Sequence, residues 1–226
     1  MTRTSIVLTL IILQVASQAL SFIISPSTLS SATLKSSRHI SKMTAQDLNT
    51  NTKIDIKIVA VKCKDDEPPI LKEGVAELFK LYFDELYELG CDLGFQGFQN
   101  EWIDLPGKYD FDKRGGLFVA TSSDSSSGEF EVIGCIAIRP LDDKCGEVKR
   151  MYIRKSHRRN GVGKLLAETI VDHAWELDYE EIKLDSLERL KGAVALYENL
   201  GFSRIEPYCE CPEDDHVCMN LFKSKE

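Results

Sequence analysis

The chain lacks three features that would place it at once in a structural class. Its apolar start is interrupted by Gln14, Ser17 and Gln18, so it is too short for a comfortable membrane span. Its seven cysteines are odd in number and scattered, unlike the dense, even disulfide framework of a small secreted protein. The formal net charge of -8 leaves no broad basic face, so nucleic-acid binding is not expected.

The sequence does not predict a bound metal either. Cys209-x-Cys211, His216 and Cys218 offer the donor types of a metal site. Their spacing matches no standard zinc pattern. The sequence therefore favours reduced, mostly buried thiols and no metal.

Acidic residues are missing from the start of the chain, where the first is Asp47. A short cationic start, an apolar run over 6–13 and small residues after it are typical of a secretory signal peptide. Residues 21–43 are rich in Ser and Thr and basic in charge, which is the composition of a transit peptide. We assign residues 1–50 to an N-terminal leader and 51–226 to one folded domain.

The leader resembles the bipartite plastid leader of algae with complex plastids, and this resemblance implies a plastid location. Two alternatives stay open: a secreted or endomembrane protein with a signal peptide alone, or a cytoplasmic protein if Met43 is the true start. No stable membrane insertion is expected once the leader is removed.

Hydrophobic periodicity predicts an α/β domain. Strands are predicted over 54–62, 116–121, 131–139, 147–154, 181–187, 203–207 and 216–222. Helices are predicted over 70–89, 98–103, 161–177 and 189–200. Hairpin strands followed by crossover helices indicate one mixed sheet with helices on both faces.

Two glycines and several basic residues lie between the strand over 147–154 and the helix that follows, in the stretch His157-Arg-Arg-Asn-Gly-Val-Gly-Lys164. A dinucleotide fingerprint needs a glycine where Leu166 stands, and a P-loop needs a hydroxyl where Leu165 stands. What remains is Arg-x-x-Gly-x-Gly at a helix start, where free N–H groups and the helix dipole attract anions. The stretch predicts a pyrophosphate site that needs no metal.

This motif resembles the [QR]-x-x-G-x-[GA] motif with which the GCN5-related N-acetyltransferase (GNAT) superfamily binds acetyl-CoA. Residues 146–164 resemble the family's fourth strand running into its third helix, and 195–202 resemble its [AL]-x-x-x-Y-x-x-x-G-F helix end. The element order matches over 54–222. Further stretches, at 93–98, 105–109 and 207–208, resemble bacterial-type members of unassigned substrate.

The resemblance implies a sheet that splays between its fourth and fifth strands, with the pantetheine arm of the cofactor in the cleft. It implies backbone contacts to that arm and to the thioester from Met151, Tyr152 and Ile153. It implies a pyrophosphate cradle made by Arg158, Arg159, Asn160, Gly161, Val162, Gly163 and Lys164. One departure is Glu188-Arg189-Leu190, which lacks the asparagine that many members use to hold the pantetheine arm.

Two catalytic residues follow from the same resemblance. Glu147 matches the general base of the family's histone-modifying members, and Tyr197 would protonate the departing CoA thiolate. The chemistry needs the base, since an amine attacks a thioester only after losing its proton. A thiolate leaves without much help, so the proton from Tyr197 would improve the rate without being indispensable. The N–H of Met151, at a distortion of its strand, would stabilise the oxyanion. Asp185 is a second candidate for the base.

The expected activity is acetyl-CoA-dependent N-acetyl transfer to a small cationic amine. Acidic residues are predicted to border the acceptor side, and such a border favours a cation: Asp84, Glu85, Glu88, Asp92, Glu206, Glu210, Glu213, Asp214 and Asp215. Aromatic residues would wall the same side: Phe95, Phe98, Trp102 and Tyr208.

Two alternatives to this activity stay open: a protein N-terminal or lysine acetyltransferase, and a non-catalytic acyl-CoA-binding module. The sequence leaves monomer and homodimer equally open.

Overall fold

The computed structural model describes residues 43–44, 54–63, 67–91, 98, 101–124 and 130–224. The leader predicted over 1–50 lies outside these residues, except for β1 (Met43–Thr44). This short strand pairs antiparallel with β2 (Ile54–Ala60), so the sheet extends into the segment that the sequence assigns to the leader. Among the described residues, no helix has both the length and the apolar character that a bilayer span requires.

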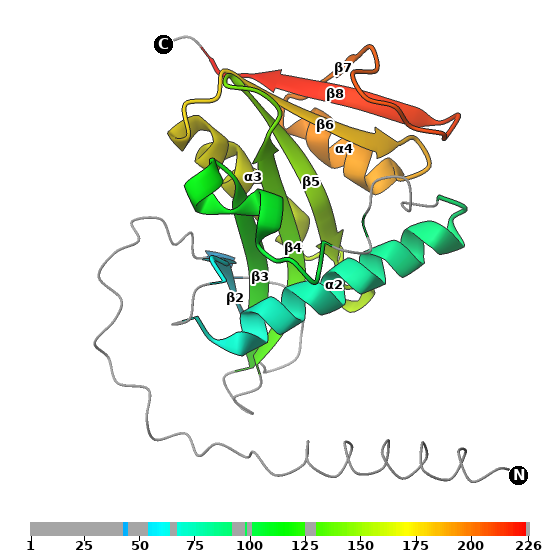
Figure 1. Cartoon of the computed structure of the whole chain (residues 1–226). Helices are drawn as coiled ribbons and strands as arrows, with labels where there is room; N and C mark the ends of the chain where they lie inside the picture. The colour runs from blue at the N-terminus through cyan, green and yellow to red at the C-terminus, as the bar shows by residue number, and fades with distance from the viewer. Residues whose placement is uncertain are drawn as a thin grey trace, which may run out of the picture. The chain divides into compact units, whose positions relative to one another are not determined.

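The described residues form the mixed α/β architecture that the sequence predicts (Figure 1). The further strands are β3 (Gly116–Asp124), β4 (Phe130–Pro140), β5 (Cys145–Ile153), β6 (Glu181–Leu187), β7 (Ser203–Ile205) and β8 (His216–Phe222). The helices are α2 (Pro69–Glu88), α3 (Val162–Glu176) and α4 (Lys191–Asn199), with short 3-10 turns η3 (Gly107–Tyr109), η4 (Phe111–Lys113) and η5 (Lys155–His157). The order in the sheet is β1-β2-β3-β4-β5-β6-β8-β7.

One predicted helix is wrong. Residues 101–103 of the helix expected over 98–103 form a turn, and the 3-10 turns η3 and η4 follow it. Phe98 is fully buried and stacks on Phe79 of α2, with ring centroids 5.8 Å apart.

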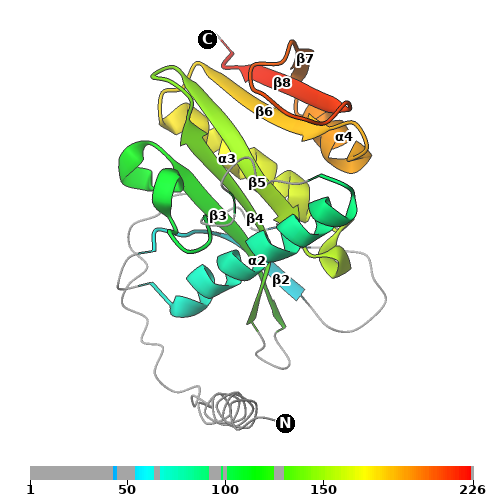
Figure 2. The ribbon, with the colours of Figure 1, turned by 45° about the vertical axis from the view of Figure 1, so that its right-hand side comes forward.

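The helices cover opposite faces of the sheet, α2 on one and α3 with α4 on the other (Figure 2). Strand β3 shows why both faces are apolar. Its side chains alternate, so Leu117 and Val119 pack under α2 while Phe118 and Ala120 pack under α3. The sheet therefore has a hydrophobic core on each face, and a polar site has to lie where neither core covers the sheet.

That place is the divergence of β5 and β6. The two strands are parallel and pair from Cys145 with Glu181 only as far as Val148 with Leu184. Beyond this point β5 continues along β4 and β6 continues along β8, so the two strands separate (Figures 1 and 2). The splay expected from the resemblance is confirmed, and it leaves one backbone edge of β5 facing a gap.

A bulge at Arg150 accompanies this divergence. Its φ is 59°, and the register with β4 shifts between Cys135 and Ala137. The buried Arg150 guanidinium donates to both carboxylate oxygens of Glu101, at 2.8 and 2.7 Å, and lies over the Phe98 ring. Burial alone would raise the pKa of Glu101, but its hydrogen bonds to Arg150 and Lys108 lower that pKa to about 2.

Glu101→Gln should lower the free energy of unfolding by about 3 kcal/mol, because it removes the carboxylate charge that pairs with the buried Arg150 guanidinium. Urea unfolding at neutral pH measures the loss. The matched control is Lys144→Gln, which breaks an exposed ion pair with Glu180 and should leave stability nearly unchanged.

The loss should also depend on pH. The folded pKa of Glu101 lies below the ordinary value of 4.5, so its stabilisation is complete above about pH 4.5 and disappears as the pH falls toward 2. The stability difference between the parent and Glu101→Gln should shrink over that window. A difference that stays constant down to about pH 2 would contradict the ion pair as its source.

Candidate active site

A cavity of about 600 Å³ lies against the free edge of β5. Its walls come from the end of α2, the end of β5, the loop before α3, and the first turns of α3 and α4. The lining residues are Tyr82, Glu85, Leu86, Met151, Tyr152, Ile153, Arg158, Arg159, Gly161, Gly163, Lys164, Arg189, Leu190, Lys191, Gly192, Ala193 and Leu196. Segments far apart in the sequence thus share one cavity.

Two helix starts meet at this cavity. Gly161 precedes α3 with a φ of 77°, which a residue with a side chain rarely adopts. A Cβ on Gly163 would lie 3.0 Å from Ile153 Cδ1, so glycine there keeps the first turn close to β5. The first N–H groups of each helix have no acceptor within the helix, and the dipoles add positive potential.

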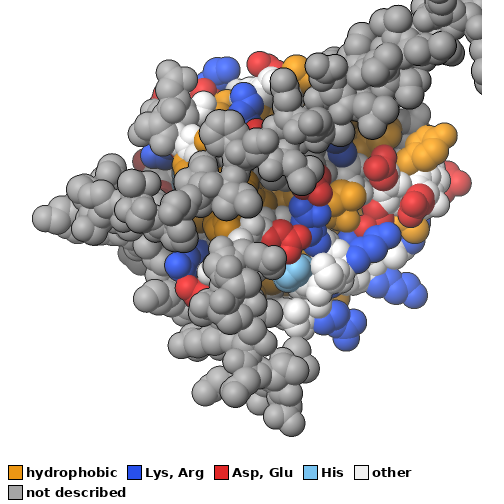
Figure 3. Space-filling view, turned by 90° about the horizontal axis from the view of Figure 1, so that it is seen from below, with side chains coloured by type: hydrophobic (Ala, Val, Ile, Leu, Met, Phe, Trp, Pro, Cys, Tyr) orange, Lys and Arg blue, Asp and Glu red, His pale blue; other side chains and the backbone are white. Residues whose placement is uncertain are grey.

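The side chains of the lining are mainly basic, and their charge adds to the positive potential of the two helix N-termini. Its basic residues are Arg158, Arg159, Lys164, Arg189 and Lys191, while Glu85 is its one acidic residue. Seen from below the view of Figure 1, lysine and arginine side chains lie among acidic ones on the uncovered surface (Figure 3). A cavity with this lining suits a long ligand that carries several phosphate charges at one end.

Arg158 is already engaged within the protein. Its guanidinium donates to both oxygens of Glu85, at 2.8 and 2.7 Å, and its Nε donates to the Ile153 carbonyl at 2.9 Å. These contacts hold α2 against the end of β5 and the loop before α3. Glu85 pairs with Arg158, so Arg158 fixes the shape of the wall, and Arg189 is likewise paired with Glu213 and Asp215. The helix N–H groups, Arg159, Lys164 and Lys191 remain to face an anion.

The structure brings most of the predicted cofactor-binding residues together. Met151, Tyr152, Ile153, Arg158, Arg159, Gly161, Gly163 and Lys164 all line the cavity. Two do not: Val162 is 2% exposed and packs into the core, and Asn160 is exposed outside the lining.

The start of α4 was missed, although Arg189-x-Lys191-Gly192 repeats the pattern of basic residues and glycine at a helix start. The sequence shows this local pattern, but only the fold brings the start of α4 into the same cavity as the start of α3.

A second, smaller cavity of about 80 Å³ lies between the separated strands. Met151 of β5, Asp185 of β6 and Tyr197 of α4 are among its lining residues. The Tyr197 hydroxyl donates to the Met151 sulfur at 3.1 Å. Burial raises the pKa of Tyr197 well above its usual value, so the phenol keeps its proton at neutral pH and can donate it.

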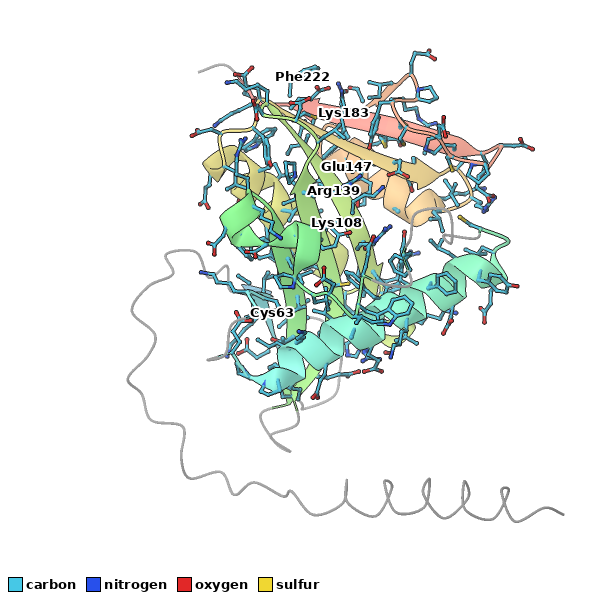
Figure 4. The ribbon with its side chains drawn as sticks, viewed as in Figure 1. Cys63, Lys108, Arg139, Glu147, Lys183 and Phe222 are labelled. Atoms are coloured by element: carbon cyan, nitrogen blue, oxygen red, sulfur yellow. The ribbon has the colours of Figure 1, made fainter. Side chains whose placement is uncertain are left out.

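Glu147 lies outside the lining of both cavities and is 2% exposed. Its Oε2 accepts from Arg139 Nε at 2.6 Å, and its Oε1 accepts from the Tyr208 hydroxyl at 3.2 Å. Figure 4 labels Glu147 and Arg139 side by side on β5 and β4. Burial and the charge of Glu147 raise the pKa of Tyr208, so Tyr208 stays protonated and acts as the donor in this contact.

Lys149 connects the two candidate bases. Its Nζ lies 2.7 Å from Asp185 Oδ1 and 3.4 Å from Glu147 Oε1. Both carboxylates therefore contact the same side-chain nitrogen. The two carboxylates differ in their surroundings. Asp185 lines the smaller cavity, whereas Glu147 contacts the Tyr208 hydroxyl.

The predicted acceptor wall is only partly assembled. Phe95 lies outside the described residues, and the Trp102 ring packs on Phe98, with centroids 5.5 Å apart, away from both cavities. Tyr208 lines neither cavity, but its hydroxyl contacts the Glu147 carboxylate.

The acidic residues of the acceptor side divide into two groups. Some are engaged in ion pairs: Glu85 with Arg158, and Glu213 and Asp215 with Arg189. Exposed acidic residues remain on the loop after β7, at Glu206, Glu210 and Asp214.

Known proteins share this sequence pattern and fold. Residues 73–202 match the model of the Acetyltransferase (GNAT) family. An uncharacterized N-acetyltransferase of Schizosaccharomyces pombe is 34% identical over 173 residues, covering 76% of this chain and 97% of the relative. One from Dictyostelium discoideum is 25% identical, covering 65% of this chain and 93% of the relative.

Solved structures share the fold at low sequence identity. An acetyltransferase from Streptococcus agalactiae superposes with a TM-score of 0.58 at 21% identity, covering 74% of this chain and 98% of the other. The yncA protein of Salmonella typhimurium, solved with its cofactor acetyl-CoA, superposes with a TM-score of 0.54 at 14% identity. That match covers 76% of this chain and 95% of the other.

Proposed function

Because the chain belongs to the acetyltransferase (GNAT) family and is an N-acetyltransferase, we propose that it transfers the acetyl group of acetyl-CoA to the primary amine of a small cationic molecule. One observation carries the proposal: two helix starts and five basic residues meet in a cavity beside the unpaired edge of β5. Acetyl-CoA in the Salmonella structure of the same fold supports the choice of co-substrate.

Each part of the cavity has a task in this proposal. The opening N–H groups of α3, with Arg159 and Lys164, bind the pyrophosphate. The free backbone edge of β5 at Met151 offers hydrogen bonds to the pantetheine arm, as a neighbouring strand would. The Arg158–Glu85 pair holds the wall in place. The thioester end then lies in the smaller cavity beside Tyr197.

The proposed reaction forms one N–C bond and breaks one C–S bond. Glu147 takes the proton that the amine loses, relayed by water or by the Tyr208 hydroxyl that already contacts its carboxylate. Lys149 and Arg139 contact the two oxygens of this carboxylate and orient it. The β5 backbone at the bulge stabilises the oxyanion, and Tyr197 gives its proton to the departing thiolate.

The proposed charge of the acceptor follows from the acidic residues of the loop that carries Tyr208. The exposed acidic residues Glu206, Glu210 and Asp214 lie before and after Tyr208 on this loop, and they give the loop a negative potential. By contrast, the cations around Glu147 are matched by carboxylates, as Arg139 and Lys149 show. The negative potential of this loop therefore favours, as acceptor, a small molecule with more than one amine.

Gly163→Glu should weaken acetyl-CoA binding at least about tenfold, because it places a carboxylate at the start of α3 and fills the space beside Ile153. Calorimetry on the purified chain measures the dissociation constant. Lys144→Glu adds negative charge on the exposed side chain of a distant turn and should bind as the parent does. Equal affinity of Gly163→Glu and the parent would move the pyrophosphate away from α3.

Substitutions at the three candidate catalytic groups should separate their roles. We expect Glu147→Gln to lower kcat by about 100-fold and Tyr197→Phe by about tenfold, with little change in acetyl-CoA affinity. Asp185→Asn should have a smaller effect on kcat than Glu147→Gln, because it acts through Lys149. Steady-state CoA-thiol release gives these values. A larger loss of kcat in Asp185→Asn would assign the base to Asp185.

A panel of acceptors tests the proposed function as a whole. We expect CoA-thiol release with polyamines and aminoalkyl compounds, and little with amines that carry a carboxylate or with peptides. Turnover of peptides alone would identify a protein acetyltransferase. Tight acetyl-CoA binding without release for any acceptor would identify a binding module.

A further inference from the structure

Three side chains that can bind a metal lie together on β8 and the loop before it, and Asp185 of β6 lies next to them. His216 and Cys218 are two positions apart on β8, so both side chains point to the same face. Asp185 of β6 pairs directly with Cys218 and shares that face. Cys209, from the loop between β7 and β8, completes the group.

The distances fit one tetrahedral ion. His216 Nε2 lies 3.6 Å from Cys218 Sγ and 3.8 Å from Cys209 Sγ, and the three donor atoms lie within 4.8 Å of one another. Zinc with bonds of about 2.3 Å to sulfur and about 2.0 Å to nitrogen separates such a pair by about 3.6 Å. Asp185 Oδ2 lies 3.9 Å from His216 Nε2, so a carboxylate is near the cluster.

The surroundings also suit a metal. Cys218 is 1% exposed, and the His216 side chain is 9% exposed. All seven cysteines are free thiols in this structure. Two thiolates and an imidazole are soft to borderline ligands, which favour zinc over the hard cations magnesium and calcium.

We propose that Cys209, His216 and Cys218 bind one Zn²⁺, with Asp185 or a water as the fourth ligand. This reverses the expectation drawn from the spacing of these residues, because the loop between β7 and β8 brings Cys209 next to the two ligands that β8 places on one face. Each thiol releases its proton when the metal binds. The proposal stands independently of the acetyl-transfer reaction.

Such an ion would anchor the acceptor side of the site. Cys209 follows Tyr208 directly, and the Tyr208 hydroxyl contacts Glu147. Fixing Cys209 to β8 therefore fixes the loop that carries Tyr208. The role is structural, since neither cavity is lined by the three ligands.

The test is metal titration of the full chain after chelation and reduction. We expect one Zn²⁺ per chain by elemental analysis, a raised melting temperature, and a thiolate-to-cobalt charge-transfer band when Co²⁺ replaces zinc. Cys209→Ser, on the loop, and His216→Ala should each lose at least about tenfold in zinc affinity. Cys63→Ser removes a thiol outside the cluster and should bind zinc as the parent does.

Three results would overturn the proposal. The first is a reduced chain that binds no zinc and shows no cobalt band. The second is zinc bound with equal affinity by the parent, Cys209→Ser and His216→Ala, which would mean an adventitious surface ion. The third is a Cys209–Cys218 disulfide found by mass spectrometry in the untreated protein, with no zinc taken up after reduction.

Discussion

The site depends on the early end of pairing between β5 and β6. Two parallel strands that stayed paired would leave no space between them and no free backbone on β5. Their pairing stops after Val148 and Leu184, where the bulge at Arg150 turns β5 and the Arg150–Glu101 ion pair holds the bulge in place. A buried charge pair is costly to form, but once formed it resists a change of backbone geometry, because separating the two charges in the core costs several kcal/mol.

The divergence then allows two helix starts to act on one cavity. α3 follows β5 and α4 follows β6, so each helix begins near the end of a strand that has left its neighbour. Their dipoles and five basic residues outweigh the single lining carboxylate, Glu85, which is already paired with Arg158. Positive potential from fixed backbone groups costs nothing to orient at the moment of binding, which suits recognition of a pyrophosphate.

A network of charges connects the proposed catalytic groups with the loop after β7. It runs from Arg139 through Glu147 and Lys149 to Asp185, whose second oxygen faces His216. Tyr208 enters the same network at Glu147. The acceptor wall, the proposed base and the proposed zinc site therefore lie on one face of the sheet, so a change in one of them affects the position of the others.

The sequence by itself determined the order and type of nearly every element, because alternation in β3 and helical periodicity in α2 are local properties. It also determined the motif to which we assign the pyrophosphate, since Arg158, Gly161 and Gly163 lie close together in the sequence.

Only the tertiary structure decided the rest, because it depends on contacts between distant residues. These include the pairing of Arg158 with Glu85, the burial of Glu147 beside Arg139, and the place of α4 in the cavity wall. The approach of Cys209 to His216 and Cys218 belongs here too, since the path of the loop between β7 and β8 sets it and the spacing alone does not.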